Sequence, residues 1–281
     1  MTATPSTPAI ALGPALRSYV TAELQAAMAG LGARGGRIHA GVHLARKAIR
    51  RTRAVLALGR LTLGPGAAPI DRELRRLNRG LSALRDAHAL VETLDRLAAK
   101  PHELAMTRLL RRARRVAATR RASCARTQVG GEPEHARRML AMLQAALQGL
   151  PWPTLSSATL IDALDLTLRG VEEARVQACT TGRNRDWHRW RRRMRRMSQQ
   201  HTACAAAGFD ISEPLFDKSL AEQLGKAQDL DLLLEHCGQG SPFTKQDRAA
   251  LRSFAEMALA RQRKRIASVS EHAAREPHPI V

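Results

Sequence analysis

The sequence predicts an all-α protein, and three observations carry that prediction. Alanine, leucine and arginine, which favour helix, dominate the composition. Aromatic residues make up only 3% of the chain and runs of β-branched residues are scarce, which disfavours sheets. Hydrophobic residues make up 44% of the 281 positions, so the chain is globular and long enough to bury a sizeable core.

Glycine and proline divide the chain into segments of helical length, each about fifteen to thirty residues long. Within one break, Pro153 followed by Ser156 and Ser157 is typical of a helix start. The N-terminal residues 1–12 are predicted to be disordered, and residues 273–281 are predicted to be a flexible tail. The expected breaks lie at residues 30–36, 63–69, 100–101, 129–133, 149–153, 180–184, 212–214 and 238–242.

The charge is strongly unbalanced. Lys and Arg number 46 against 25 Asp and Glu, which gives a formal net charge of +21. A net positive charge this large destabilises the compact state through repulsion between like charges, and it exceeds what solubility requires. It favours a polyanionic partner, which could be nucleic acid, an anionic membrane surface or a phosphate polymer. An Arg-rich but ordinary solvated surface is the alternative.

The four cysteines are widely spaced and no pair has C-x-x-C spacing, so neither a zinc site nor a redox motif is expected. They are predicted to act as small, partly buried apolar groups in a reducing compartment. The N-terminus lacks the basic and apolar regions of a signal peptide. No run of about twenty apolar residues suggests a membrane span.

Two segments recur in the same order. "HLARKAIRR" (43–51) resembles "HRWRRRMRR" (188–196) at an offset of 145 residues. "LNRGLSALRDAHALVE" (77–92) aligns with "LAEQLGKAQDLDLLLE" (220–235) at an offset of 143 residues. We therefore predict a single domain over residues 13–272, built from two homologous halves at about 13–128 and 150–272. A pseudo-two-fold arrangement would let both basic helices face one central groove.

Both basic helices are predicted to be amphipathic. In the first, no acid lies between Arg37 and Arg60, and its like charges at i, i+4 repel each other. In the second, Trp187 and Trp190 lie opposite the basic face and are expected in the core. A helix that tolerates such repulsion is expected to bind an anion, and rungs about 5.4 Å apart suit a linear string of phosphates. The candidate ligands are His39, His43, Arg46, Lys47 and Arg50 with the flanking Arg51 and Arg53, and then His188, Arg191, Arg192, Arg195 and Arg196.

Two further cationic segments, near residues 108–115 and 261–265, are weaker candidates. The candidate ligands in these segments are Arg112, Arg115, Arg261 and Lys264. Asp86 and Asp229 recur with the repeat, and we expect them to form internal salt bridges that aim an arginine of the basic helix.

The histidines are not expected to bind metal or to catalyse. His39 and His43 are spaced i, i+4, but H-E-x-x-H is absent and the neighbouring arginines would repel a divalent cation. No nucleophile or partnered carboxylate indicates acid–base chemistry. We expect each histidine to donate a hydrogen bond to phosphate or to orient an arginine. They should be neutral in the empty protein and charged in the complex, which predicts tighter binding at mildly acidic pH.

These motifs resemble the CHAD family, a helical domain named for its conserved histidines. "HLARKAIRRTR" (43–53) is similar to its first basic motif, and "HRWRRRMRRM" (188–197) to its second. "LGKAQDLD" (224–231) matches the L-G-x-x-x-D-x-D pattern well, whereas "LSALRDAH" (81–88) departs at Ser82 and His88. The resemblance implies two pseudo-symmetric helical bundles around a basic central groove. It also implies non-catalytic binding of inorganic polyphosphate, without a cofactor, at polyphosphate granules in the cytoplasm.

Two alternatives stay open. A nucleic-acid binder would use the same basic faces, but few aromatic residues are available to stack on bases and no known nucleic-acid-binding motif is present. An enzyme acting on phosphate esters has less support, because the chain carries neither a Walker A sequence nor an acidic metal-binding cluster.

Overall fold

The computed structural model describes residues 11–127, 131–209, 211 and 218–275, with side chains as far as Ser270 except that of Lys218. Within these ranges the regular structure is entirely helical, as predicted. Two short 3₁₀ turns, Gly35–Arg37 and Trp152–Thr154, join longer elements. The α-helices are α1 (Leu12–Leu31), α2 (Ile38–Leu58), α3 (Ala67–Gly80), α4 (Ser82–Ala98), α5 (Leu104–Thr127), α6 (Glu132–Gln148), α7 (Ser157–Thr181), α8 (Asn184–Ala206), α9 (Lys218–His236) and α10 (Lys245–Arg275).

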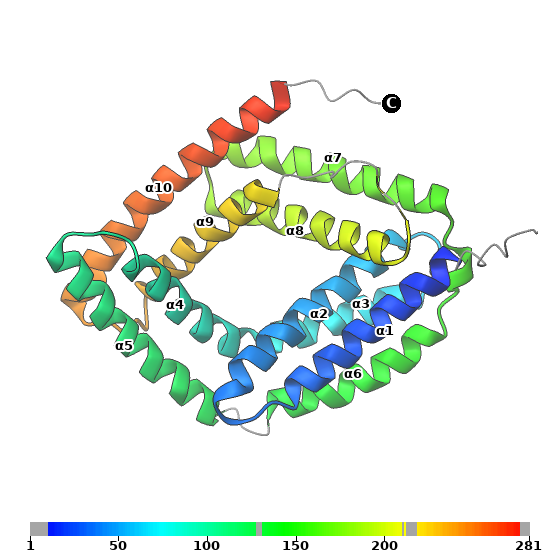
Figure 1. The fold of residues 1–281 in the computed structure, drawn as a ribbon, viewed down its shortest axis with the longest axis horizontal. Helices are drawn as coiled ribbons and strands as arrows, with labels where there is room; N and C mark the ends of the chain where they lie inside the picture. The colour runs from blue at the N-terminus through cyan, green and yellow to red at the C-terminus, as the bar shows by residue number, and fades with distance from the viewer. Residues whose placement is uncertain (1–10, 128–130, 210, 212–217, 276–281) are drawn as a thin grey trace, which may run out of the picture.

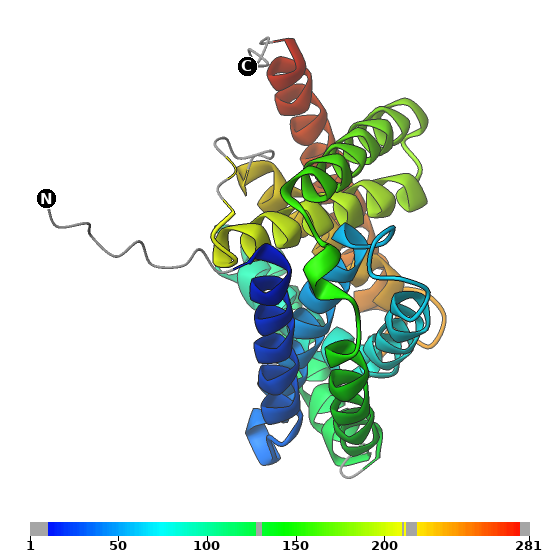
Figure 2. The same ribbon diagram turned by 90° about the vertical axis from the view of Figure 1, so that its right-hand side faces the viewer.

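Four helical hairpins organise the molecule: α1 with α2, α4 with α5, α7 with α8, and α9 with α10. In Figure 1 one helix of each hairpin, α2, α4, α8 or α9, lies nearer the centre of the view, and its partner lies farther out, with α6 beyond α1. The inner helices also pack on one another, α2 against α8 and α4, and α9 against α4 and α8. In the turned view of Figure 2, α7 and α8 run at a steep angle to α1 and α2. The two basic helices, α2 and α8, are therefore direct neighbours.

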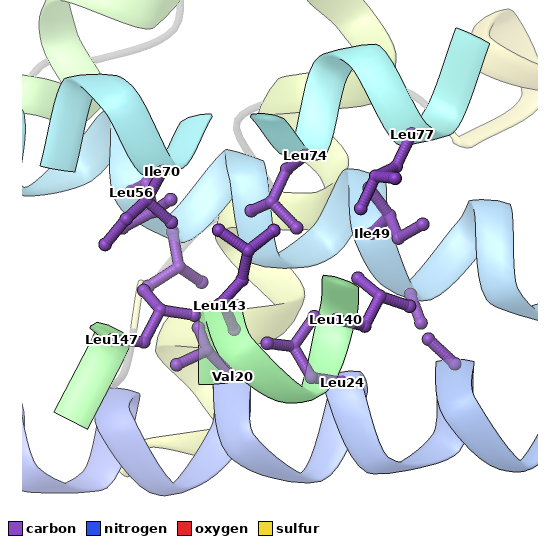
Figure 3. Close-up of a cluster of buried hydrophobic side chains, with 14 of the residues drawn as sticks. Val20, Leu24, Ile49, Leu56, Ile70, Leu74, Leu77, Leu140, Leu143 and Leu147 are labelled. Carbon is purple, nitrogen blue, oxygen red and sulfur yellow. The ribbon is translucent and has the colours of Figure 1, made fainter. Parts of the chain in front are cut away.

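Two hydrophobic clusters hold these helices together, and they do not coincide with the two halves of the sequence. The first is built mainly from α1, α2, α3 and α6, whose leucine and isoleucine side chains interdigitate in Figure 3. The second is built from α4, α5, α9 and α10. Helices α7 and α8 contribute to both, with Leu160 and Cys204 in the first and Val171 and Trp190 in the second. Each half thus completes the core of the other.

The sequence breaks are mostly where expected, with one addition. Residues 70–99 were expected to be one helix, but the chain turns at Leu81, where φ is −79° and ψ is 6°. This turn buries Leu81 completely. It also exposes the last carbonyls of α3, and Arg46 of α2 donates a hydrogen bond to the Asn78 carbonyl oxygen. The break was missed because its capping group comes from another helix.

The predicted helix start near Ser156 is confirmed, since its hydroxyl accepts a hydrogen bond from the Thr159 N–H at 3.2 Å. At the ends, the predictions of disorder for residues 1–10 and of flexibility for residues 276–281 lie outside the described residues. Helix α1 begins at Leu12, and α10 continues to Arg275, three residues into the segment expected to be a flexible tail.

No disulfide joins the four cysteines, all of which lie in the described part of the chain; Cys204 and Cys237 are buried and the other two are partly buried. Of the helices described, none is both long and apolar enough to cross a bilayer.

Candidate functional site

Both basic helices turn their apolar faces inward, as their sequence patterns predict. On α2, Val42, Ala45 and Ile49 are buried, and on α8 the two tryptophans, Trp187 and Trp190, are buried with them. The opposite faces of α2 and α8 carry the arginines. Because α2 packs against α8 and α4, these arginines gather where the three helices meet.

Five arginines form what we call the arginine cluster: Arg46 and Arg50 of α2, Arg85 of α4, and Arg191 and Arg195 of α8. Burial is the largest influence on four of them, and it lowers the pKa of Arg50 to about 9 and that of Arg46 to about 10. Burial also lowers the pKa of Arg195 well below its usual range, and the other four members of the cluster lower it further. The pKa of Arg191 falls for the same reason, with Arg85 adding to the effect. A protein rarely gathers buried like charges unless something compensates for them.

Compensation inside the protein is incomplete. Arg46 donates a second hydrogen bond to the Ser82 hydroxyl at 3.1 Å, and Arg85 pairs with Asp86 at 3.0 Å. By contrast, no ion pair with a carboxylate is found for Arg50 or Arg195 among the described residues. The Nε atoms of Arg46 and Arg50 are buried and have no hydrogen-bond partner. The cluster therefore offers donors and positive charge to an anion.

The two recurring aspartates act differently from expectation. Asp86 pairs with its neighbour Arg85, and Asp229 pairs with Arg96 of α4 at 2.9 Å. Neither ion pair involves an arginine of the basic helices. Both aspartates still act on those helices at longer range, because Asp86 raises the pKa of Arg46 and Asp229 raises that of Arg191.

The histidines of α2 occupy two environments. His39 is buried, its Nδ1 lies 3.3 Å from the Leu84 carbonyl oxygen, and its ring stacks on His88 at 5.6 Å. His39 therefore packs between α2 and α4, and it is not one of the side chains that face the arginine cluster. His43 is more exposed, and burial lowers its pKa, with Arg50, Arg85 and His88 acting in the same direction and Glu92 opposing them. The expectation that these histidines are neutral in the empty protein agrees with the lowered pKa of both.

The pKa of His188 is shifted in the opposite direction. Its Nε2 lies 2.6 Å from an Asp231 carboxylate oxygen, and Nδ1 lies against the amide oxygen of Gln228. The hydrogen bond with Asp231 is the largest influence, and it raises the pKa of His188 because the carboxylate favours the charged ring. Asn184 donates to the other oxygen of Asp231 at 3.1 Å and holds the pair in place. The two halves differ here because the second has Asp231 at the aligned position where the first has His88. This difference is visible in the sequence.

A cleft of about 400 Å³ adjoins the arginine cluster on the α4 side. The equivalent position in the second half, beside α8, is almost filled by side chains, and only about 10 Å³ of open space is left there. Trp187, Asp231 and Arg263 line that filled position, and Arg263 lies over the Trp187 ring at 5.4 Å. The open cleft is lined by His43, Arg85, His88, Ala89, Glu92, Thr93, Arg96 and Asp229. An anion can therefore reach the cluster from the α4 side.

Several predicted ligands lie outside the cluster, paired with carboxylates. Arg51 pairs with Glu23 of α1 at 2.8 Å, and Arg53 makes two hydrogen bonds to Asp71 of α3, at 2.7 and 3.2 Å. Arg112 makes a two-pronged ion pair with Asp247 that joins α5 to α10. These arginines connect helices, and each already has its counter-charge.

The remaining predicted ligands are exposed on the helix surfaces. Arg196 is exposed overall, but partial burial of its charged group and the nearby Arg53 lower its pKa, because it lies at the edge of the α2–α8 junction. On α10, Arg263 faces α8 and donates to Asn184 at 2.8 Å, whereas Arg261 and Lys264 are exposed. The exposed set is Lys47, Arg115, Arg192, Arg196, Arg261 and Lys264.

Sequence reasoning missed several residues of the site, chiefly Arg85 and Arg96 of α4 and Gln228 of α9. Arg85 and Gln228 lie on the second segment of the repeat, which was treated as support for the basic helices, and Arg96 lies four residues beyond it. Arg85 and Gln228 occupy the same position in the aligned segments, so the alignment itself contained a signal for both.

Comparisons with known proteins agree with this fold. The family model of the CHAD domain matches residues 18–238. The crystal structure of the CHAD domain from the plant Ricinus communis is similar over 97% of this chain and 94% of that chain, with a TM-score of 0.66 and 17% sequence identity. No curated protein matches the sequence. On the strength of the family match and of the all-helical architecture, the chain belongs to the CHAD family.

Proposed function

We propose that this protein binds inorganic polyphosphate without catalysis, through the arginine cluster and His43, and that it associates with polyphosphate granules in the cytoplasm. One observation carries the proposal: Arg50 and Arg195 are partly buried at the α2–α8 interface, beside other arginines and without a carboxylate ion pair among the described residues. A polyanion would supply the missing charge and accept the unused N–H groups.

A phosphate polymer suits this site better than a nucleic acid, which is usually recognised through its bases as well as its phosphates. The guanidinium groups come from three helices and converge, so they can surround a flexible chain that has anionic oxygens on every side. Nucleic-acid binders usually add aromatic side chains on which bases stack. Here the three tryptophans are buried in the hydrophobic clusters, and Tyr19 is packed against the first. Nucleic acid therefore remains the competing ligand in the test.

Competition binding tests the proposal. Labelled long-chain polyphosphate is bound to the whole protein at near-physiological salt, and unlabelled polyphosphate, DNA or RNA is added at equal phosphate concentration. We expect polyphosphate to displace the probe at far lower concentration than either nucleic acid. Equal or better displacement by DNA or RNA would replace polyphosphate with nucleic acid as the ligand.

Three further readouts sharpen the result. The affinity should fall steeply as salt rises, because each bound phosphate releases counterions. Incubation of the pure protein with polyphosphate should release no orthophosphate, and sustained release would show an enzyme. A fluorescent fusion should gather at polyphosphate granules, and the same fusion carrying Arg195→Glu should not.

A further inference from the structure

A second basic pocket lies outside the arginine cluster, where the chain turns from α9 into α10. We call it the α9–α10 pocket. It encloses about 430 Å³ and is lined by Cys237, Gly238 and Gln239 of the turn and by Lys245, Arg248 and Arg252 of α10. None of these residues belongs to the arginine cluster or lines the cleft beside α4. In Figure 1 the turn lies beside α5 at the left of the view, away from α2.

The three cations of the pocket form one row along α10. Lys245, Arg248 and Arg252 are spaced i, i+3 and i+7, so they share a helix face over about 10 Å. No carboxylate ion pair is found for any of them in the part of the chain that the structure describes. Asp247 does not line the pocket, and it pairs with Arg112 of α5. Like charges at these spacings repel one another, so an anion bound along the row would stabilise it.

Hydrogen bonds fix the turn that forms the wall of the pocket. Arg252 donates to the Cys237 carbonyl oxygen at 2.7 Å, and Arg120 of α5 donates to the Gly240 carbonyl oxygen at 3.2 Å. Burial raises the pKa of the Cys237 thiol to about 11, whereas Arg252 and Arg248 act in the opposite direction. Both guanidinium groups therefore lie close to the turn, and the pocket has a fixed wall beside a positive face.

The equivalent hairpin of the first half lacks this row. Segments 77–92 and 220–235 align, so α4 corresponds to α9, and the helices that follow them, α5 and α10, correspond to each other. The row occupies the first, fourth and eighth residues of α10, where α5 has Leu104, Thr107 and Arg111. Three cations at these positions are therefore not needed to build a hairpin of this kind, which indicates a separate role for them.

We propose that the α9–α10 pocket binds a compact diphosphate or triphosphate group, carried by an inorganic oligophosphate or by a nucleotide. Arginine donates paired hydrogen bonds to phosphate oxygens and lysine adds a point charge. A row about 10 Å long therefore suits two or three linked phosphates better than a single one. The volume of the pocket is in the range of small-molecule sites. Because the pocket is separate from the arginine cluster, its occupation does not depend on the proposed function.

Lysine protection tests this proposal on the whole protein. The chain has six lysines, of which Lys245 alone lines the pocket. Inorganic triphosphate or ATP is titrated, a trace of an amine-reactive reagent is added, and mass spectrometry measures the modification of each lysine. Lys100 is the reference, because it is exposed in the equivalent turn between α4 and α5. We expect half-protection of Lys245 at a ligand concentration at least about tenfold lower than for Lys100.

The two ligands distinguish the source of the phosphates. Equal protection by triphosphate and ATP would show that the phosphate groups alone are recognised, and stronger protection by ATP would identify a nucleotide site. Both results support the proposal. Half-protection of Lys245 and Lys100 at the same concentration would overturn it, because binding would then be a general effect of exposed cations.

Arg248→Gln examines the row directly. The half-protection concentration of Lys245 should rise about tenfold or more, because a charge-assisted hydrogen bond is lost. No side-chain hydrogen bond of Arg248 is found among the described residues, so the fold should be retained, which circular dichroism checks. Arg169→Gln, at an exposed position of α7, is the matched control and should leave the value unchanged. An unchanged value in Arg248→Gln would contradict the proposal.

Arg195→Glu separates this site from the arginine cluster. The variant should lose polyphosphate binding if the proposed function is correct, yet it should keep the protection of Lys245 by triphosphate. Loss of that protection in Arg195→Glu would assign the triphosphate to the arginine cluster and overturn the α9–α10 pocket as a site.

Discussion

Arg50 of α2 lowers the pKa of Arg195 of α8 across the interface between the two basic helices. Two partly buried cations that disfavour each other's charge make this interface less stable than an apolar one would be. The same pair is what an anion would bind most strongly. Stability and binding are therefore opposed at this point, and single substitutions can separate them.

Replacing Arg195 with Met should strengthen the fold and weaken binding. The free energy of unfolding should rise by about 1 kcal/mol, since a partly buried charge is exchanged for an apolar group of similar length. The affinity for polyphosphate should fall about tenfold or more, because at least one charge-assisted hydrogen bond is lost. Urea denaturation and the polyphosphate binding assay measure the two effects. Arg108→Met, on the exposed side of α5, is the control and should change neither strongly. A loss of stability in Arg195→Met would show that the charge is compensated in the free protein.

Polyphosphate binding should tighten as the pH falls, and His43 should be responsible. The pKa of His43 in the free protein lies below its ordinary 6.5, and a bound polyanion raises it, so the ring takes up a proton on binding. The affinity should therefore rise as the pH falls through the raised pKa of the complex, and level off below the lowered pKa of the free protein. Binding measured between about pH 5.5 and 8 checks this. His43→Gln should flatten the profile, whereas His135→Gln on α6 should leave it unchanged.

Arg112 should matter for stability and not for binding, although its sequence context made it a candidate ligand. Its guanidinium lowers the pKa of Asp247, so the pair stabilises the fold above the ordinary carboxyl pKa of 3.8. That contribution is lost as the pH falls through the lowered pKa of Asp247. Arg112→Leu should lower the urea midpoint at pH 7 and make less difference near pH 3. Its polyphosphate affinity should equal that of the wild type, and a clear loss would return Arg112 to the binding site.

Gly41 should be intolerant of a side chain. A Cβ atom there would lie 2.0 Å from the Gly30 carbonyl oxygen, because α1 and α2 meet backbone to backbone. Gly41→Ala should cost about 2 kcal/mol of unfolding free energy, as overpacking forces the helices apart. Gly36→Ala, in the turn between the same helices, meets no atom within 4 Å and serves as the control. Thermal unfolding of the two variants, compared with wild type, measures the difference.

The features of the site that could be predicted are those that depend only on the sequence of a single helix. The alternation of apolar and basic positions placed Ile49 and Trp190 in the core and Arg50 and Arg195 on the opposite face. The Ser156 cap was likewise visible, because capping depends on neighbours in sequence. These features follow from helical periodicity and local hydrogen bonding.

The parts that were not predictable depend on partners from other helices. Nothing local distinguishes Arg50, which has no carboxylate ion pair in the described part of the chain, from Arg51, which pairs with Glu23 twenty-eight positions away. Arg85 joined the cluster only through the packing of α4. The repeat was visible in sequence, but the opposite pKa shifts of His43 and His188 depend on which side chain lies opposite each ring. Histidines at equivalent positions of similar motifs can therefore have pKa values shifted in opposite directions.

The sharing of α7 and α8 between both hydrophobic clusters bears on how the chain folds. Suppose that the polypeptide is divided near residues 149–153. The N-terminal fragment would then lack α7 and α8, which complete its core, and the C-terminal fragment would expose apolar faces that the N-terminal fragment normally covers. Neither fragment should fold alone, yet the two together should reassemble by complementation. In the intact chain, the same interlocking should make heat denaturation one cooperative transition, so that a ligand bound between α2 and α8 would protect the whole molecule.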